Sequence, residues 1–293
     1  NRTMVDEYWR GMLGSETIPA LLFFFIIFLI PESPRWLIVH GEGAKASSVL
    51  QKIYLSPDEA SRQKSITEDS IKGEVKTEWK ALLSPGILKA VLIGSAIAIL
   101  GQFMGVNAVL YYGPEIFKEA GLSSGDALFS QVLVGFVNMG TTVIALLIID
   151  KVGRKNLVYW GVSGMILSLL MIGFYFTFPE QLGSIFMLVF FLFYVFCCAI
   201  SICAVVFVLL SEMYPNNVRG IAMSIAGLAL WIGTYLIGQL TPWLLANVPP
   251  FAPAGTFFLF ALMCVPYLLI MWKLVPETTG KTLEEIERYW KEK

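Results

Sequence analysis

The hydrophobic residues of the chain are gathered into seven long stretches that polar segments separate. Each stretch has roughly the 20 mainly apolar residues that a helix needs to cross the hydrocarbon core of a bilayer. In chain order they are Met12–Ile30, Ile87–Tyr112, Ala127–Ile149, Leu157–Phe178, Ile185–Leu210, Ile221–Ala246 and Ala254–Leu274. The pattern therefore predicts an all-α membrane protein with seven transmembrane helices.

One long polar segment, Pro31–Pro85, lies between the first and second stretches. It holds a Ser-Pro-Asp-Glu helix start and a run rich in Lys and Glu, which predict a mostly helical subdomain in water. The chain then consists of one span in residues 1–30, a helical linker in 31–86, a six-span part in 87–275 and a C-terminal segment in 276–293.

The composition agrees with a membrane protein, since 56% of the residues are hydrophobic, 15% are charged and the mean hydropathy is +0.70. The net charge is −1 with no long run of like charges, so nucleic acid is not an expected partner. The four cysteines lie in apolar stretches and His40 is the single histidine, so the spacing predicts neither a disulfide framework nor a metal site. No paired intramembrane acids and no nucleophile beside a base occur, so we expect neither catalytic residues nor a cofactor.

Basic residues are distributed unevenly between the two sides of the predicted helices. All but three of the 21 Lys and Arg residues fall in one set of alternate loops and ends, and the opposite set holds only Arg2, Arg10 and Lys118. Loops rich in basic residues stay in the cytoplasm. We therefore expect an exoplasmic N-terminus, with the linker and the C-terminus in the cytoplasm, in a plasma membrane or a bacterial inner membrane.

The first and last apolar stretches end alike. Pro31-Glu32-Ser33 follows the first, and Pro276-Glu277-Thr278 follows the last. In both, proline stops the helix and the hydroxyl residue can cap the next one. The agreement suggests two halves in parallel repeat, an arrangement of transporters that bind substrate near the midplane between the halves. On this interpretation the first span closes an N-terminal half that is missing from this chain and is an expected partner.

Polar side chains inside lipid-length helices usually face protein or a water-filled cavity. The second stretch carries Gln102 and Asn107, with Gly105 and Pro114 nearby to allow a break or a bend. An amide offers two donors and an acceptor, enough to bridge neighbouring hydroxyls of a sugar, and the spacing brings both amides within reach of one cavity. Two interpretations stay open, contact with a sugar and hydrogen bonds that hold helices together.

Asn138 in the third stretch and Trp231 in the sixth are further candidates. Asn138 has the same two interpretations. Trp231 lies away from the interfacial belt where membrane Trp is commonest, so its indole could stack on a sugar ring and donate to a hydroxyl. The alternative is that Trp231 fills space between helices.

A charged constellation lies at the cytoplasmic ends of the third, fifth and sixth stretches. Its members are Asp150, Arg154, Glu212 and Arg219. Opposite charges at helix ends on one membrane face can form interhelical pairs that hold one conformation shut, with Gly153 making the turn. Anchoring by cytoplasmic basic residues would explain the arginines but not the acids, which favours gating pairs.

Five motifs carry a resemblance to a known family. They are Pro31–Leu37, residues 101–112, Asp150–Lys155, Ser211–Gly220 and Pro276–Glu284. In order and spacing they resemble the successive motifs of the sugar porter family of the major facilitator superfamily, which includes bacterial proton–xylose symporters and facilitative glucose transporters. The resemblance covers essentially the whole chain. It implies the last span of an N-terminal half and the six-helix C-terminal half of a major facilitator fold, joined by an intracellular helical bundle.

The resemblance also implies three groups of functional residues. The substrate-binding group is Gln102, Asn107, Asn138 and Trp231. The extracellular gate is Tyr111 and Tyr112. The intracellular salt-bridge lock is Asp150, Arg154, Glu212 and Arg219.

This sequence departs from the family pattern in several places. Gly101-Gln102 stands where a Gln-Gln pair is usual, and Ile202–Phe207 replaces a Gly- and Pro-rich stretch that ends in Trp. Leu230 and Thr234 replace the amides that flank the sixth-span Trp. Together these changes make the expected cavity less polar. The intramembrane acid of proton-coupled relatives is absent from this chain.

We expect alternating-access transport of a monosaccharide, a hexose or a pentose, with proton symport and facilitated diffusion both open. The chain alone would be incomplete for transport. The expected partners are the sugar, the lipid bilayer, the missing half and, for symport, protons. The alternative is a transport-inactive membrane sugar sensor, which the less polar cavity supports.

Overall fold

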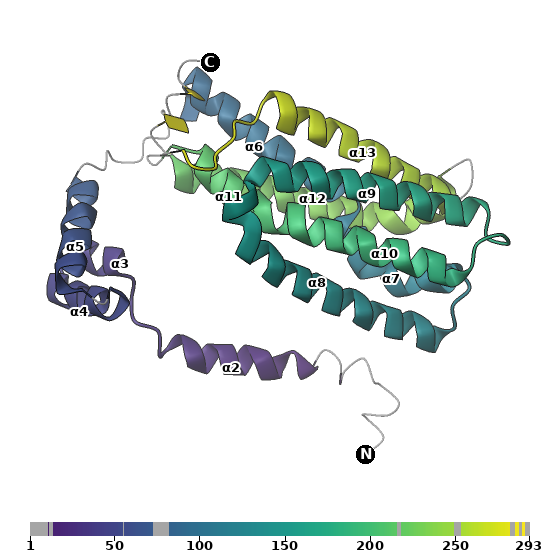
Figure 1. Cartoon of the computed structure of the whole chain (residues 1–293), viewed down its shortest axis with the longest axis horizontal. Helices are drawn as coiled ribbons and strands as arrows, with labels where there is room; N and C mark the ends of the chain where they lie inside the picture. The colour runs from purple at the N-terminus through teal and green to yellow at the C-terminus, as the bar shows by residue number, and fades with distance from the viewer. Residues whose placement is uncertain are drawn as a thin grey trace. The chain divides into compact units, whose positions relative to one another are not determined.

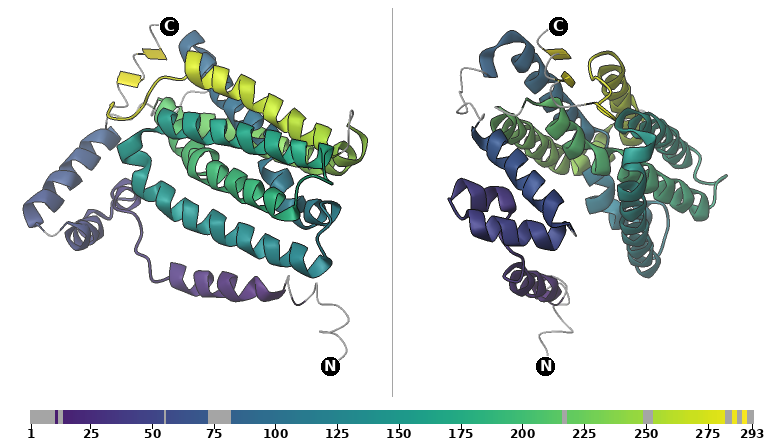
Figure 2. Two further views of the ribbon diagram at one scale, coloured as in Figure 1. Left: turned by 45° about the vertical axis from the view of Figure 1, so that its right-hand side comes forward. Right: turned by 60° about the vertical axis from the view of Figure 1, so that its left-hand side comes forward.

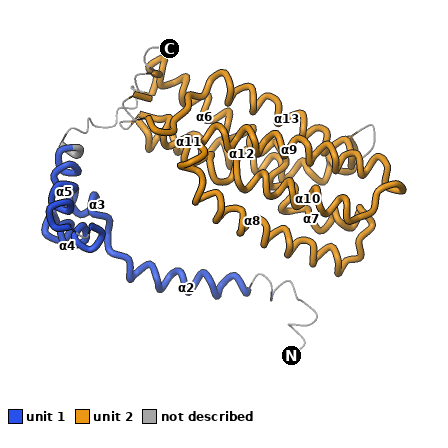
Figure 3. Tube along the Cα trace, viewed as in Figure 1, with its two compact units in different colours: residues 1–75 blue, residues 76–293 orange. Residues whose placement is uncertain are grey.

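Every regular element is a helix in the computed structural model, which describes residues 11, 14–54, 56–72, 82–215, 218–248, 253–281, 285–286 and 289–290 (Figure 1). The chain divides into two compact units, unit 1 with residues 1–75 and unit 2 with residues 76–293 (Figure 3). Each unit has its own set of helices.

Unit 1 begins with α2, Thr17–Ile27, which lies within the first apolar stretch. Its 11 residues rise about 16 Å, roughly half the thickness of the hydrocarbon core. The predicted span Met12–Ile30 is longer than this helix, and Met12 and Leu13 lie outside the described residues. The described helix is therefore too short to cross a bilayer by itself, and the seventh span stays a prediction.

The described residues of the polar linker form three further helices in unit 1, α3 (Pro34–Val39), α4 (Gly43–Ile53) and α5 (Pro57–Lys72). The start of α3 follows from the Pro-Glu-Ser pattern. The Ser33 Oγ accepts a hydrogen bond from the Trp36 N–H at 3.2 Å, and proline occupies the first helical position.

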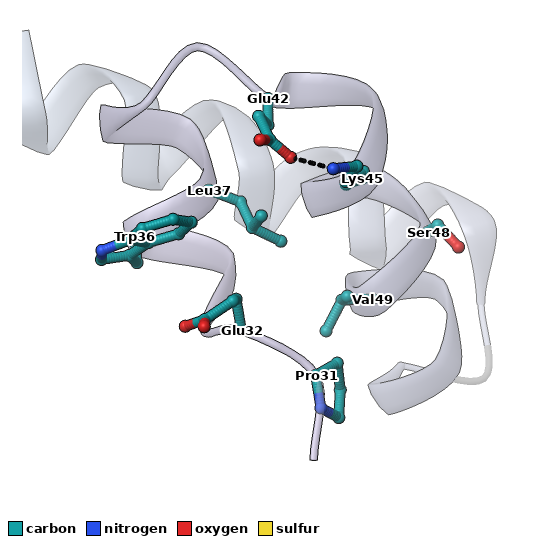
Figure 4. A pocket seen from close by; sticks show the side chains of 8 residues that line it. All are labelled: Pro31, Glu32, Trp36, Leu37, Glu42, Lys45, Ser48 and Val49. Carbon is teal, nitrogen blue, oxygen red and sulfur yellow. Dashed lines mark ion pairs between the residues drawn. The ribbon is translucent and has the colours of Figure 1, made fainter. Parts of the chain in front are cut away.

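A surface pocket of about 410 Å³ lies between α3 and α4 (Figure 4). Its lining residues are Pro31, Glu32, Trp36, Leu37, Glu42, Lys45, Ser48 and Val49. At its edge the Glu42 Oε2 and the Lys45 Nζ form an ion pair of 2.6 Å. Leu37 and Leu50, which are 4% and 5% exposed, pack between the helices. None of the residues of the three functional groups predicted above lies in this pocket.

Among its described residues, unit 2 holds six helices that are long and apolar enough to cross a membrane (Figure 1). In chain order they are α6 (Pro85–Phe103) with α7 (Val106–Glu119), α8 (Ser124–Val152), α9 (Arg154–Thr177), α10 (Ser184–Cys198) with η2 (Ala199–Cys203) and α11 (Ala204–Met213), α12 (Arg219–Asn247) and α13 (Ala254–Lys273). They coincide with the last six apolar stretches, so this part of the prediction is confirmed.

These helices pack side by side in one bundle (Figure 2). Helix α12 lies along α6, and α9 packs against both α10 and α13. Glycine allows α9 to approach its neighbour closely. A Cβ on Gly161 would clash with the side chain of Ser201, and one on Gly164 would clash with the Sγ of Cys197.

The first spanning helix of unit 2 is broken between α6 and α7, where the sequence offered glycine. Gly105 has a φ of +89°, a left-handed conformation that L side chains rarely adopt. A Cβ at this position would lie 2.5 Å from the ring of Phe260 on α13. Gly105 therefore permits both the break and the close approach of α13. Gly153, with a φ of +93°, makes the expected turn between α8 and α9.

The fifth predicted span contains a π-helical turn, η2, between α10 and α11. A π-turn holds one more residue than an α-turn and is frequent at functional sites. The segment Ala199-Ile200-Ser201-Ile202-Cys203 contains no proline or glycine that would predict this turn. Hydrophobicity alone predicted a continuous helix here.

Candidate substrate site and charge cluster

Three helices bring uncharged polar side chains together beside the break between α6 and α7. The Asn107 Nδ2 group donates to the Gln102 Oε1 at 2.7 Å and lies 3.4 Å from the Thr234 Oγ1. The Thr234 hydroxyl lies 3.2 Å from the same Gln102 oxygen. We call these three residues the amide cluster. It joins α6, α7 and α12, and Thr234 had been identified from sequence only as a departure from a pattern.

The internal bonds use only part of the hydrogen-bonding capacity of the amide cluster. The Gln102 oxygen accepts a bond from Asn107, and it shares the single Thr234 hydroxyl proton with the Leu230 carbonyl oxygen, which lies 3.0 Å from that hydroxyl. The Gln102 amide N–H groups and the Asn107 carbonyl oxygen have no hydrogen-bond partner among the residues that the structure describes. Two donors and one acceptor are therefore left for a hydroxylated ligand.

Pro114 lies inside α7 and has no N–H to donate to the Leu110 carbonyl, four residues earlier. Gln131 on α8 replaces that donor, since its Nε2 group donates to the Leu110 oxygen at 2.9 Å. Lipid offers a carbonyl no alternative partner, so this bond stabilises the proline-containing helix and ties it to α8. Sequence reasoning missed Gln131. The available signal was the carbonyl that Pro114 leaves without a donor.

A second proline has the same effect on α12. Pro242 leaves the Gly238 carbonyl without its helical donor, and the Tyr112 hydroxyl donates to that oxygen at 2.9 Å. Tyr112, one of the two predicted gate residues, thus joins α7 to α12. Its neighbour Tyr111 is 58% exposed.

The carbonyl at the α6–α7 break is also satisfied. Met104 follows the last residue of α6, and its oxygen accepts a hydrogen bond of 2.8 Å from the Tyr194 hydroxyl on α10. Both residues are buried. Tyr194 was missed as well, because nothing in the sequence tells which face of α10 meets the break.

The other two predicted substrate residues lie outside the amide cluster. Asn138 lines a recess of about 10 Å³ together with Leu110 and Tyr194. Trp231 precedes Thr234 by three residues on α12, and its side chain is 66% exposed. This exposure contradicts the interpretation that Trp231 fills space between the helices of unit 2. Gln102 and Asn107 are hydrogen-bonded to each other, and among the described residues neither makes a hydrogen bond to the side chain of Asn138 or Trp231.

Arg154 is the centre of a charge cluster at the ends of α8, α9 and α11. Its Nη2 atom lies 2.9 Å from the Asp150 Oδ1 and 2.8 Å from the Glu212 Oε1. The Arg154 and Glu212 side chains are 12% and 23% exposed, whereas that of Asp150 is 77% exposed. Water screens the Asp150 pair more, so the Glu212 pair is the stronger one. Together they join the ends of α8, α9 and α11.

Arg219, the fourth predicted lock residue, lies at the turn between α11 and α12. Its Nε and Nη2 groups donate to the Tyr214 carbonyl oxygen at 3.3 and 3.2 Å. The Tyr214 side chain is buried, and this burial raises the pKa of its hydroxyl above the ordinary value. Arg219 therefore stabilises the turn that follows the helix of Glu212.

The C-terminal Pro-Glu-Thr motif holds the backbone of Arg154. The Thr279 Oγ1 accepts a hydrogen bond of 3.3 Å from the Arg154 N–H and donates to the Glu277 Oε1 at 2.9 Å. The Lys155 Nζ donates to the Val275 carbonyl oxygen at 2.8 Å. The motif thus caps the start of α9 and positions the arginine.

Known proteins resemble this chain along nearly all of its length. A family model described as "Sugar (and other) transporter" matches residues 1–290. The D-xylose-proton symporter of Escherichia coli is 39% identical over 288 residues, which are 96% of this chain and 57% of that protein. The arabinose-proton symporter of Bacillus subtilis is 37% identical over 286 residues, 98% of this chain and 61% of that protein. The glucose transport protein of Synechocystis sp. is 36% identical over 289 residues, 95% and 61% respectively.

Solved structures of transporters also resemble this chain. The proton:xylose symporter XylE bound to 6-bromo-6-deoxy-D-glucose superimposes with a TM-score of 0.76 at 38% identity, covering 96% of this chain and 59% of that one. The inward-open xylose transporter XylE from E. coli gives a TM-score of 0.74 at 36% identity, covering 96% and 57%. The chain spans about three fifths of the length of these relatives.

The bond from Gln131 to the carbonyl freed by Pro114 can be tested by a double-mutant cycle. Gln131→Met should lower the free energy of unfolding by about 1 kcal/mol, because a carbonyl at bilayer depth loses its donor. In a Pro114→Ala background the loss should be smaller, since the alanine N–H then bonds to Leu110. Unfolding in mixed micelles measures both. Gln181→Met, at an exposed turn, is the control that should change nothing. Equal losses in the two backgrounds would contradict the assignment.

Proposed function

Because the chain belongs to the sugar porter family of the major facilitator superfamily, we propose that it forms part of a carrier that moves a monosaccharide across the membrane by alternating access. It is a multi-pass membrane protein of a transporter family, not of an enzyme family. The relatives are longer, and in this proposal their additional length corresponds to the half that completes the substrate site.

The amide cluster is the observation that carries this proposal. It presents the Gln102 amide N–H groups and the Asn107 carbonyl oxygen beside a helix break, where lipid could not satisfy them. Sugar hydroxyls accept hydrogen bonds from the former and donate to the latter. A carrier must also release its cargo. Uncharged groups suit this requirement, because they can exchange sugar for water without stranding a buried charge.

Trp231 and Asn138 complete the substrate site in this proposal. The exposed indole of Trp231 lies on the same helix as Thr234 and offers a flat apolar face and an N–H group. Asn138 contributes a third amide, from α8, which packs against α7. The indole of Trp231 suits the apolar face of a sugar ring, and the amide of Asn138 suits its hydroxyl groups.

The substrate of the proposal is a hexose or a pentose. The names of the relatives include D-xylose, arabinose and glucose, which supports this range. Two of the names include a proton, which favours proton symport over facilitated diffusion. Leu230, beside Trp231, has no hydrogen-bonding group in its side chain. The proposed site would therefore form fewer hydrogen bonds to sugar hydroxyls than a site with an amide at this position.

Tyr111 and Tyr112 form the extracellular gate in this proposal. The bond from the Tyr112 hydroxyl to the Gly238 carbonyl supports it, because it links the gate helix α7 to the bend of α12. A movement of α7 would then reach the helix that carries Thr234. Coupling between binding and closure requires such a shared two-state element.

Arg154 and Glu212 form the core of the intracellular lock, with Asp150 and Arg219 around them. The described pairs join helices of one unit, so they stiffen the cytoplasmic ends of α8, α9 and α11 as one body. A half that rocks as one body needs a rigid cytoplasmic end in order to close against the other half. In this proposal the cytoplasmic side is closed only when the two halves meet there, so the lock depends on both halves.

The orientation in the proposal follows the basic residues. The N-terminus is exoplasmic, and the linker and C-terminus are cytoplasmic. The first apolar stretch, Met12–Ile30, crosses the membrane in addition to the six helices of unit 2. The membrane is a plasma membrane or a bacterial inner membrane.

A transport-inactive membrane sugar sensor is the second candidate. The apolar and thiol side chains of Ile202–Phe207, in place of a helix-breaking stretch, favour it. A sensor would bind D-xylose or D-glucose in proteoliposomes without equilibrating it across the membrane. A carrier would do both, so uptake and binding measured on one preparation separate the two functions.

Sugar binding tests the amide cluster. In the complete transporter, Asn107→Ala should weaken the binding of D-xylose or D-glucose by roughly tenfold, because one hydrogen bond of about 1.4 kcal/mol is lost. Isothermal titration measures the dissociation constant. Asn247→Ala is the matched control, since this asparagine lies at the exposed end of α12 and donates to the Trp243 carbonyl. Equal affinities of the two variants would reduce Asn107 to a residue that only joins helices.

Cytoplasmic accessibility tests the lock. In the complete transporter, Glu212→Arg places two cations side by side and should bias the carrier toward the inward-open state. If loss of the charge pair shifts the equilibrium toward the inward-open state by about 1.4 kcal/mol, the population of that state rises roughly tenfold. The labelling rate of a cytoplasmic cysteine should rise by the same factor. Adding Arg154→Glu should restore the original rate. Glu180→Arg, in the loop at the opposite end of α9, is the control. An unchanged labelling rate in Glu212→Arg would argue against the lock.

A further inference from the structure

The π-turn η2 brings two cysteines of one helix together. Cys198 precedes the turn and Cys203 ends it. In an α-helix, side chains five residues apart are rotated by about 140° from each other and diverge. A π-turn closes its hydrogen bond over five residues, so the rotation falls to roughly 50°. The two sulfur atoms consequently lie only 3.6 Å apart.

The surroundings leave this pair open on one side. Cys203 is exposed, whereas Cys198 is 4% exposed. Both thiols line the recess of about 10 Å³ that also contains Asn138, a volume close to that of one water-sized probe. The other lining residues are Val106, Val109, Leu110, Tyr194 and Val195. A single atom can therefore sit between the sulfurs while any bulky substituent on it points outward past Cys203.

We propose that Cys198 and Cys203 form a dithiol site that binds a thiophilic centre, specifically a trivalent organoarsenical. Two thiols react with one arsenic that carries two hydroxyl groups. Two As–S bonds form, two As–O bonds and two S–H bonds break, and two water molecules leave. Arsenic stays trivalent and no electron is transferred, so no oxidant is required.

The sulfur separation supports a bridging atom over a disulfide. Two sulfurs bonded at about 2.3 Å to one tetrahedral or pyramidal centre lie roughly 3.7 Å apart, close to the observed 3.6 Å. A disulfide would require them to approach to about 2.05 Å and would need an oxidant. The thiolate softness that selects soft metals also selects trivalent arsenic. The site holds whether or not the carrier proposal is correct, because it depends only on the turn.

Retention of phenylarsine oxide tests the site in the complete membrane protein. Intact mass spectrometry should find the arsenical retained in about 10 mM 2-mercaptoethanol, because the second thiol acts intramolecularly at a high effective concentration. The dithiol 2,3-dimercaptopropanol should remove it. Cys198→Ser and Cys203→Ser should each lower the competing monothiol concentration needed for release by about 100-fold.

Two matched controls separate this pair from the other thiols. Cys197→Ser alters the adjacent residue, whose sulfur faces Gly164 on α9, and Cys264→Ser alters a buried cysteine of α13. Both should retain the arsenical as the unchanged protein does. Retention that survives Cys203→Ser, or that disappears in either control, would overturn the assignment. Because Cys203 is exposed, Cys203→Ser decides the matter even if Cys198→Ser fails to fold.

Discussion

A membrane offers no hydrogen bonds to a broken helix, and this constraint shapes unit 2 around its breaks. Every carbonyl that loses its helical donor at bilayer depth must find another donor within the protein. Pro114 frees the Leu110 carbonyl, and Gln131 supplies the donor. The Tyr112 hydroxyl does the same for the carbonyl that Pro242 frees in α12. The breaks are therefore fixed points at which α7 is tied to its neighbours.

These ties explain how a mostly apolar bundle can display polar groups without losing stability. The carbonyls freed by Pro114 and Pro242 and the Met104 carbonyl at the α6–α7 break each accept a hydrogen bond from a side chain of another helix, so the amides of Gln102 and Asn107 are not needed there. They bond instead to each other and to Thr234. Their remaining donor and acceptor atoms are available to a ligand in the proposed site. In the proposal, these amides can bind substrate because other residues satisfy the carbonyls at the breaks.

The length and apolar composition of the hydrophobic stretches predicted the six long helices of unit 2, because lipid imposes a length and a composition that few other structures share. Gly105 and Pro114 likewise indicated a break, since both residues restrict the backbone in known ways. The donors could not be predicted. Whether Gln131 or Tyr194 meets a freed carbonyl depends on the rotation of α8 and α10 about their axes, and nearly uniform apolar sequences leave that rotation open. The uniform apolar sequence around η2 likewise gave no sign of a π-helical turn. The length of α2 was also not predicted, because this helix is shorter than the apolar stretch that contains it.

The central claim is that uncharged polar side chains of α6, α7 and α12 surround one water-filled hollow that accepts a sugar. Charged thiol reagents test it directly in a complete transporter that carries a single cysteine at a chosen position. Thr234→Cys should react with a membrane-impermeant methanethiosulfonate, and D-xylose or D-glucose should slow the reaction. Leu262→Cys, at an exposed apolar position of α13, should not react. No reaction at Thr234→Cys, or a rate that sugar leaves unchanged, would contradict the account.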